Sequence, residues 1–75
     1  MEFIYNYDEL KKRILNKYVK LTNFSNDLGI SQPTLSKRLN NKSDFSFNEI
    51  VRTVELLEID VNDIHDCFFT TKQAV

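Results

Sequence analysis

The stretch FSNDLGISQPTLSKRLN, from Phe24 to Asn40, decides the fold because it predicts two short helices joined by a tight turn. Gly29 can adopt the left-handed conformation that ends a helix. Ser31 is a favourable N-cap for the second helix, and Pro33 falls in its first turn, where a missing N–H costs least. We therefore expect a helix-turn-helix, with helices from about residue 21 or 22 to 28 and from 32 to 39.

Each of these two helices carries apolar residues four positions apart: Phe24 and Leu28 on the first, Leu35 and Leu39 on the second. This spacing places one apolar stripe on each helix. Ser25 lies four residues before the turn glycine, where a small side chain lets two helices cross closely. The pattern predicts that both helices pack inward and leave the polar side chains of the second helix in solvent.

Capping signals predict three further helices, over about 7–18, 47–57 and 61–67. Asn6 and Glu9 resemble a capping box at the start of the first, and Ser46 and Glu49 form a second box. Asp60 is a favourable cap for the last. The expected buried stripe of the helix over 47–57 consists of Phe47, Ile50, Val51, Val54 and Leu57.

Length and composition place the chain in the all-α class, as a compact bundle of five short helices. Its 75 residues suffice for one domain, 1–75, and a single Gly and a single Pro are too few for a turn-rich β fold. Hydrophobic residues make up 41% and charged residues 28%, as in an ordinary globular protein. We expect an ordered core over 6–69 and a frayed tail over 70–75.

The net charge of −1 is unevenly distributed along the chain. Residues 1–43 carry eight Lys and Arg against four Asp and Glu, whereas residues 44–75 carry two against seven. No acidic residue lies between Asp27 and Asp44, and Lys37, Arg38 and Lys42 fall in this interval. A molecule with this asymmetry can present a positive surface to a phosphate backbone despite its balanced total.

Other classes of protein find little support. The single cysteine cannot form an internal disulfide, so a cytoplasmic location fits best, and no apolar run is long enough to span a membrane. His65 and Cys67 are two positions apart on a helix and do not face each other, so we expect no metal site and no cofactor. No nucleophile motif or Gly-rich loop is present, and neither an enzyme nor a small-molecule substrate is expected.

The residues expected to be exposed on the helix over 32–39 carry groups that can recognise DNA bases. Gln32 can pair with adenine and Lys37 with guanine, and Pro33 can touch a thymine methyl group. A solvated polar helix face is the alternative interpretation of the same residues. Asn40, Lys42 and Arg38 are better suited to phosphates, which fix register without reading sequence.

The chain resembles the lambda-repressor-like helix-turn-helix family of phage repressors and Cro proteins. The likeness lies in the helix over 7–18 and in three segments, FSNDLGISQPTLSKRLNNK, FNEIVRTVELLEID and DIHDCFF. The closest likeness is to small single-domain proteins from phages of low-GC Gram-positive bacteria. The resemblance implies base contacts at Ser31, Gln32, Pro33, Ser36 and Lys37. It implies phosphate contacts in the polar turn after this helix, at Asn40 and Lys42, and we expect further phosphate contacts at Thr22, Asn23 and Arg38.

The chain departs from the family pattern at several positions. Leu21 stands where such domains often have a phosphate-binding Gln, and Ser25 replaces the usual Ala. Asn41 and Glu58 stand where Gly is common. Near the end of the helix over 32–39, Arg38 stands where the family commonly has an apolar residue.

Two functions from different classes follow from this likeness. The first is a Cro-like transcriptional regulator that binds double-stranded operator DNA in a lysis–lysogeny switch, as a homodimer on half-sites about 34 Å apart. The second is a modulator of repression, which binds the N-terminal domain of a partner CI-type repressor; an antitoxin is a distant third. Phe68 and Phe69 cannot both point inward, so one of them is expected to offer an interface to a protein.

Overall fold

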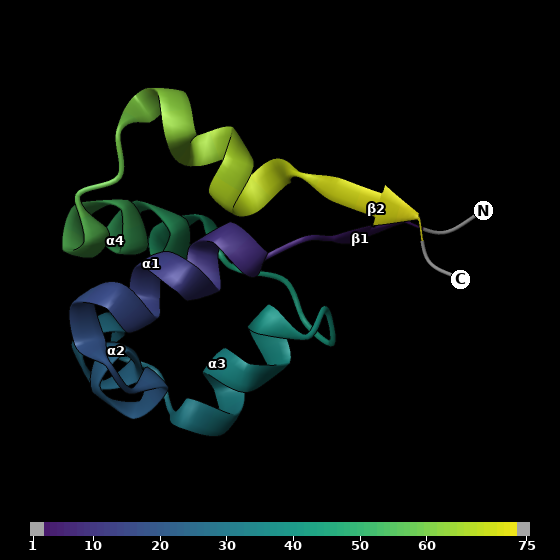
Figure 1. The fold of residues 1–75 in the computed structure, drawn as a ribbon. Coiled ribbons are helices and arrows are strands. Elements are labelled where there is room, and N and C mark those ends of the chain that lie inside the picture. The colour runs from purple at the N-terminus through teal and green to yellow at the C-terminus, as the bar shows by residue number, and fades with distance from the viewer. Residues whose placement is uncertain (1–2, 74–75) are drawn as a thin grey trace.

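The computed structural model describes residues 3–73, which fold into an all-α bundle closed by one small strand pair (Figure 1). In chain order its elements are β1 (Phe3–Tyr5), α1 (Asp8–Tyr18), α2 (Leu21–Leu28), α3 (Gln32–Leu39), α4 (Phe47–Leu57), the 3-10 helix η1 (Val61–Asp63), the π-helix η2 (His65–Phe69) and β2 (Thr71–Gln73). In Figure 1, α2 and α3 form the lower part of the molecule, η1 and η2 the upper part, and α1 and α4 lie between them.

The core is a single buried cluster drawn from α1, α2, α3, η2 and the segments beside them, and partly buried residues of α4 pack against it. It contains Tyr7, Leu10, Ile14, Phe24, Leu28, Leu35, Leu39, Ile59, Cys67 and Phe68. Phe45 joins the loop before α4 to this cluster, because its ring packs edge-on against the rings of both Tyr7 and Phe68, with centroids 5.4 Å apart in each pair. Such edge-to-face pairs stabilise aromatic clusters beyond the burial of their area. The cluster holds η2 against α1 and the start of α4.

The predicted bounds of α2 and α3 are confirmed, as is the second capping box. The Ser46 hydroxyl accepts the Glu49 N–H and the Glu49 carboxylate accepts the Ser46 N–H, both at 3.1 Å. The first box does not form. Asn6 caps the Asp8 N–H at 2.9 Å, but Glu9 pairs with Arg13, one turn along the helix, and α1 begins one residue later than expected.

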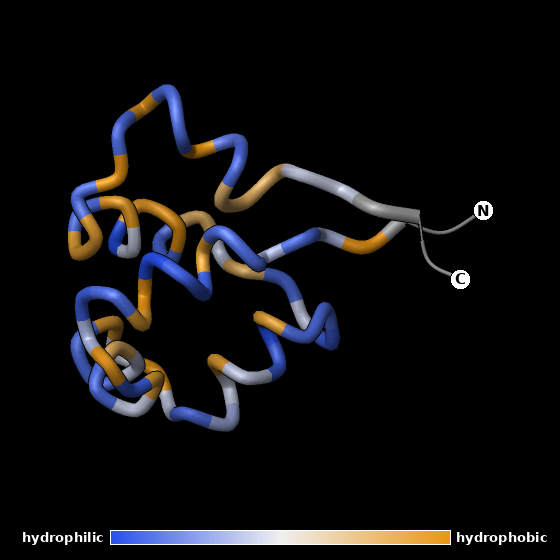
Figure 2. Tube along the Cα trace, in the orientation of Figure 1, coloured by the Kyte–Doolittle hydropathy of each residue, from blue (hydrophilic) through white to orange (hydrophobic). Residues whose placement is uncertain are grey.

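The buried stripe predicted for α4 is wrong at two positions. Phe47 is 78% exposed and Val51 is 41% exposed, whereas Thr53 is fully buried. The helix is therefore rotated relative to the expected orientation, and its apolar residues exceed what the core covers. Figure 2 shows the same imbalance, since α4 carries more hydrophobic colour than α3. Apolar periodicity could not place this face because the stripe is wide enough to allow several rotations.

The last helix and the tail also differ from expectation. The helix predicted over 61–67 is divided into η1 and η2, with Asp60 accepting the Asn62 N–H at 2.9 Å as the expected cap. The frayed tail predicted over 70–75 is wrong for Thr71–Gln73, which form β2 and pair antiparallel with β1. The Asn6 N–H also donates to the Thr70 carbonyl at 2.7 Å, extending this ribbon. Residues 74 and 75 lie outside the described part of the chain.

Every helix in the described part of the chain is too short or too polar to span a bilayer.

Thr53 is a weak point in the packing of α4. Its side chain is fully buried, and its Oγ1 has no hydrogen-bond partner. An unpaired buried hydroxyl destabilises the folded state, because unfolding returns it to water. We predict that Thr53→Val raises the free energy of unfolding by about 1 kcal/mol, measured by urea denaturation. Thr22→Val, at an exposed site, is the control and should change little; a Thr53→Val variant less stable than wild type would contradict the prediction.

Candidate nucleic-acid interface

The turn between α2 and α3 depends on Gly29, whose φ of +88° lies in the left-handed region. Its N–H and that of Ile30 donate to the Ser25 carbonyl, at 2.9 and 3.1 Å, and this closes the C-terminus of α2. Apart from the two neighbouring residues, no heavy atom lies within 4 Å of the position that a Cβ would occupy, so the backbone angle alone favours glycine here. Ser25 itself is buried, as its small size predicted, and its hydroxyl donates to the Thr22 carbonyl.

Ser31 starts α3 as the predicted N-cap. Its Oγ accepts the Thr34 N–H at 3.2 Å and donates to Thr34 Oγ1 at 2.8 Å. Pro33 occupies the first turn. The hydroxyl of Ser31, expected to contact a base, is thus already used to hold the end of the helix, although the residue as a whole is exposed.

The outward face of α3 carries the predicted base-contacting residues. Only Leu35 and Leu39 of this helix are buried, at 0% and 4% exposure. In Figure 2 the helix is correspondingly blue or pale along most of its length. Each predicted base contact lies in solvent: Ser31, Gln32, Pro33, Ser36 and Lys37. The structure therefore brings these five side chains to one exposed element that is available to a large partner.

Four of the predicted phosphate contacts are exposed, two on α2 and two just after α3. Thr22 and Asn23 are exposed in the first turn of α2, and the Asn23 side chain is 3.5 Å from the Tyr18 carbonyl. Asn40 and Lys42 are exposed just after α3. The Lys42 N–H donates to the Lys37 carbonyl at 2.9 Å, which fixes the turn that carries it.

Arg38, predicted as a phosphate contact, is instead paired with a carboxylate inside the protein. Its Nε and Nη2 donate to the two carboxylate oxygens of Glu49 at 2.9 and 3.3 Å, and its Nη1 donates to Ser43 at 2.6 Å. Both side chains of the pair are mostly buried, with 20% and 15% exposed. The hydrogen bonds from Arg38 hold the pKa of Glu49 below its usual value, and the burial of the carboxylate opposes this only in part. A bidentate pair of this kind fixes orientation, so it sets the angle of α3 against α4.

Asn41 forms a second tether that sequence reasoning missed. Its φ of +62° is the left-handed turn that an asparagine favours. From this position its side chain accepts the Tyr5 N–H at 2.8 Å and donates to the Tyr5 carbonyl at 2.9 Å. The asparagine thus pairs with the outer edge of β1 as a neighbouring strand would. The residues are 36 positions apart, so no local pattern could have indicated the contact.

The expected protein interface at Phe68 and Phe69 is corrected for one of the two residues. Phe68 is 2% exposed and belongs to the core, because Phe45 fills the space beside it. Phe69 is 47% exposed. Consecutive residues on a helical turn point in different directions, so the pair divides between the core and the surface.

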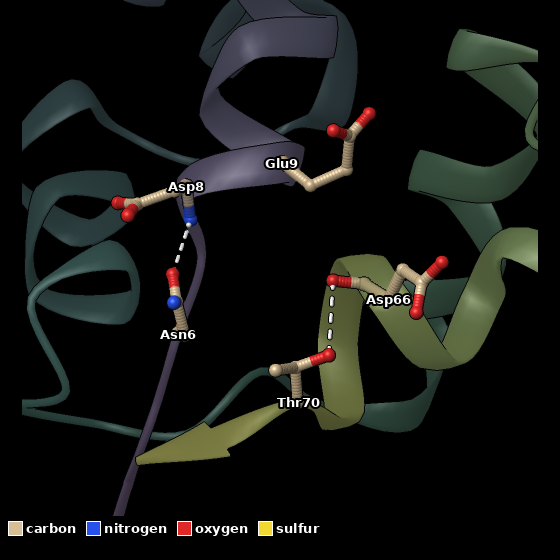
Figure 3. Close-up of a pocket in the computed structure, with 5 residues that line it drawn as sticks. All are labelled: Asn6, Asp8, Glu9, Asp66 and Thr70. Carbon is tan, nitrogen blue, oxygen red and sulfur yellow. Dashed lines mark hydrogen bonds between the residues drawn. The ribbon is translucent and has the colours of Figure 1, made fainter.

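A polar hollow beside the start of α1 offers no further site. Asn6, Asp8, Glu9, Asp66 and Thr70 line it, and Figure 3 shows that its three carboxylates point in different directions rather than toward one centre. Its polar groups are used locally, as Asn6 caps α1 and Thr70 donates to the Asp66 carbonyl. Among residues 3–73, no three His, Cys, Asp or Glu side chains are grouped to hold a metal ion.

The electrostatic surroundings of α3 favour a negatively charged partner. Lys37 and Lys42 are exposed beside it, and no acidic residue lies within the stretch from Leu28 to Ser43. The first turn of α3 presents backbone N–H groups and carries the positive end of the helix dipole. The carboxylate of Glu49, in the first turn of α4, approaches α3 but is neutralised by Arg38.

A family model described as a protein of unknown function (DUF739) matches residues 3–71 of the chain. No curated protein matches the chain.

The Arg38–Glu49 pair should make the stability of the fold depend on pH in the acidic range. Because the pKa of Glu49 is lowered by folding, its stabilisation is complete above the pKa of an unfolded glutamate, about 4.3, and is lost as the pH falls through the folded pKa. Glu49→Gln keeps the side-chain shape and an acceptor for the Ser46 N–H but removes the charge. We predict that this variant has a free energy of unfolding about 1.5 kcal/mol lower than wild type at pH 7, measured by thermal denaturation. Between pH 5 and 3, its stability should change less than that of wild type. Equal pH profiles for the two proteins would show that the pair contributes nothing.

Proposed function

The chain belongs to the DUF739 family, and we propose that it is a Cro-like transcriptional regulator that binds double-stranded DNA through α3. In this proposal the helix-turn-helix of α2 and α3 docks as in the lambda-repressor-like family, with α3 in the major groove. The observation that carries the proposal is the orientation of α3. Leu35 and Leu39 bury one side of it, and the other side presents donors and acceptors to solvent.

The residues on this exposed side match the chemistry of base edges. The amide of Gln32 can donate and accept at adenine, and the ammonium group of Lys37 can donate to guanine O6 or N7. Both lie on the outer face of a helix whose N-terminus and inclination are fixed, by the Ser31 cap and the Arg38–Glu49 pair. A helix held in this way can present its side chains in a constant register, which direct reading of bases requires.

Phosphate contacts in the proposal come from the start of α2 and from the turn after α3. Thr22 and Asn23 at the start of α2, and Asn40 and Lys42 after α3, are exposed and carry groups that can donate to phosphate oxygens. They would hold the protein on the backbone without reading sequence. One such module reads few bases, so the proposal includes two copies on neighbouring half-sites.

Selection from a pool of random duplexes tests the proposal, because the operator sequence does not have to be chosen in advance. We predict that wild-type protein enriches a short motif at about 50 mM salt, and that its affinity for the motif falls steeply as salt is raised. Gln32→Ala should relax the preference at one base position, with a loss of about 1–3 kcal/mol of discrimination in fluorescence anisotropy titrations.

Lys37→Ala and Lys17→Ala form a matched pair for this experiment. Both remove one positive charge, but the Lys17 ammonium group lies at the C-terminal end of α4, bonded to the Leu56 carbonyl and 3.7 Å from Glu58. Lys37→Ala should weaken binding to the selected duplex much more than Lys17→Ala does. Equal losses would indicate a general charge effect, and failure of the wild-type protein to enrich any motif would overturn the proposal.

A further inference from the structure

An apolar groove runs between α4 and η2. Its lining includes six apolar residues, Phe47, Ile50, Val51, Val54, Ile64 and Phe69, and its volume is about 330 Å³. The groove exists because α4 turns Thr53 rather than Phe47 and Val51 toward the core. The apolar residues left over from the core thus form one continuous surface on the α4 side of the molecule.

A second hollow of about 240 Å³ extends this surface toward β1. The two hollows share Ile50 and Phe69, and the second adds Tyr5 and Phe45 to the lining. Phe47, which lines the first hollow, is 78% exposed. Exposed apolar residues that are contiguous rather than scattered mark an interaction surface, since water contact with such a patch is unfavourable. None of these residues belongs to the proposed DNA contacts.

The charged residues of the groove are acidic. Glu55 lines the first hollow and Asp44 the second, and both are exposed and without an ion pair among the described residues. The described lining of the two hollows includes neither Lys nor Arg. A partner that fills the groove therefore gains most when it brings positive charge beside its apolar side chains.

We propose that this groove is a docking site for an amphipathic helix of another protein, with apolar residues along one side and Lys or Arg beside them. The groove follows the face of α4 from Phe47 to Glu55, about 12 Å or two helical turns. This length suits a helix that inserts apolar anchors at positions i, i+4 and i+7. Glu55 and Asp44 would then face the cationic flanks of the partner.

A second copy of the chain fits this surface less well. In a two-fold contact each copy presents the same patch to the other. Groove facing groove would bring the carboxylates of Glu55 and Asp44 close to those of the partner copy, and like charges at an interface oppose association. The groove therefore favours a partner of opposite charge.

Two synthetic helical peptides that differ only in charge test the proposal. Both carry Leu at i, i+4 and i+7, and one has Lys and the other Glu at the flanking positions. We predict that the full chain binds the Lys peptide about three- to tenfold more tightly in fluorescence anisotropy at low salt. This preference should shrink as salt is raised, because exposed charges are screened. Equal affinity for the two peptides would overturn the proposal.

Three single substitutions test whether the peptide binds in the groove. Val51→Asp introduces a charge into its floor and should lower the affinity for the Lys peptide more than about tenfold. Leu15→Asp is the matched control, because Leu15 is similarly exposed, at 45% against 41% for Val51, but lies on α1. Circular dichroism confirms that both variants fold, and Glu55→Lys should reverse the preference between the peptides. Unchanged binding by Val51→Asp would contradict the proposal.

Sedimentation equilibrium of the chain alone tests whether a second copy of the chain occupies the groove. We expect no self-association through the groove. A dimer that Val51→Asp converts to a monomer would assign the groove to a second copy and overturn the proposal. The DNA-binding proposal is tested separately, because Val51→Asp leaves every proposed DNA contact in place.

Discussion

The packing of α3 against α2 through one narrow apolar stripe is the constraint on which the rest of the structure depends. Leu35 and Leu39 are the buried residues of α3, and they join Phe24 and Leu28 of α2 in the core. Ser25 is buried beside the turn, and its small size lets the two helices approach. Since a stripe two residues long fixes only one side of a helix, the opposite side remains in solvent for a partner. The tilt of α3 must then be fixed by other contacts, which Arg38 and Asn41 provide.

These tethers connect α3 to parts of the chain that are distant in sequence. Arg38 reaches Glu49 at the start of α4, and Asn41 reaches Tyr5 in β1. Glu49 also completes the capping box of α4, so the same carboxylate caps one helix and orients another. The β1–β2 ribbon in turn joins the two ends of the described chain. Loss of any one contact would loosen the orientation of α3 without removing its buried stripe.

Local signals in the sequence were sufficient for the helix-turn-helix. Gly29, Ser31 and the four-residue apolar spacing act over one or two turns, and the bounds of α2 and α3 followed from them. Features that depend on distant residues could not be predicted. The three residues of β1 have no periodicity of their own, and their partner lies at the other end of the chain. Arg38 carried a charge suitable for a phosphate, and only its position in space shows that Glu49 uses it.

The rotation of α4 illustrates the same limit within a single helix. Its apolar residues span more of its circumference than the core requires, so the pattern alone allowed either Val51 or Thr53 to face inward. In the folded protein α4 packs against α1 and α2, and in this orientation the hydroxyl of Thr53 is buried without a partner. The apolar groove beside η2 is a direct consequence, and sequence analysis had indicated it only through the exposed member of the Phe68–Phe69 pair.

The charge asymmetry between the two halves of the chain is partly offset by ion pairs between them. Of the seven carboxylates in residues 44–75, Glu49, Glu58 and Asp63 pair with cations from the first half. The acidic half is therefore less acidic at its surface than its composition implies, and what remains near the groove is Asp44 and Glu55. Lys37 and Lys42 stay exposed beside α3. The molecule thus carries exposed cations at α3 and exposed carboxylates at the groove.

The central claim is that the outer side of α3 meets double-stranded DNA, and an NMR titration of the labelled chain with a short duplex at low salt measures this most directly. We predict amide shifts concentrated over residues 31–42 and the start of α2, with Phe47, Val51 and Val54 on the α4 side unchanged. Shifts confined to α4 and η2, or no shifts at any ratio of DNA to protein, would contradict it.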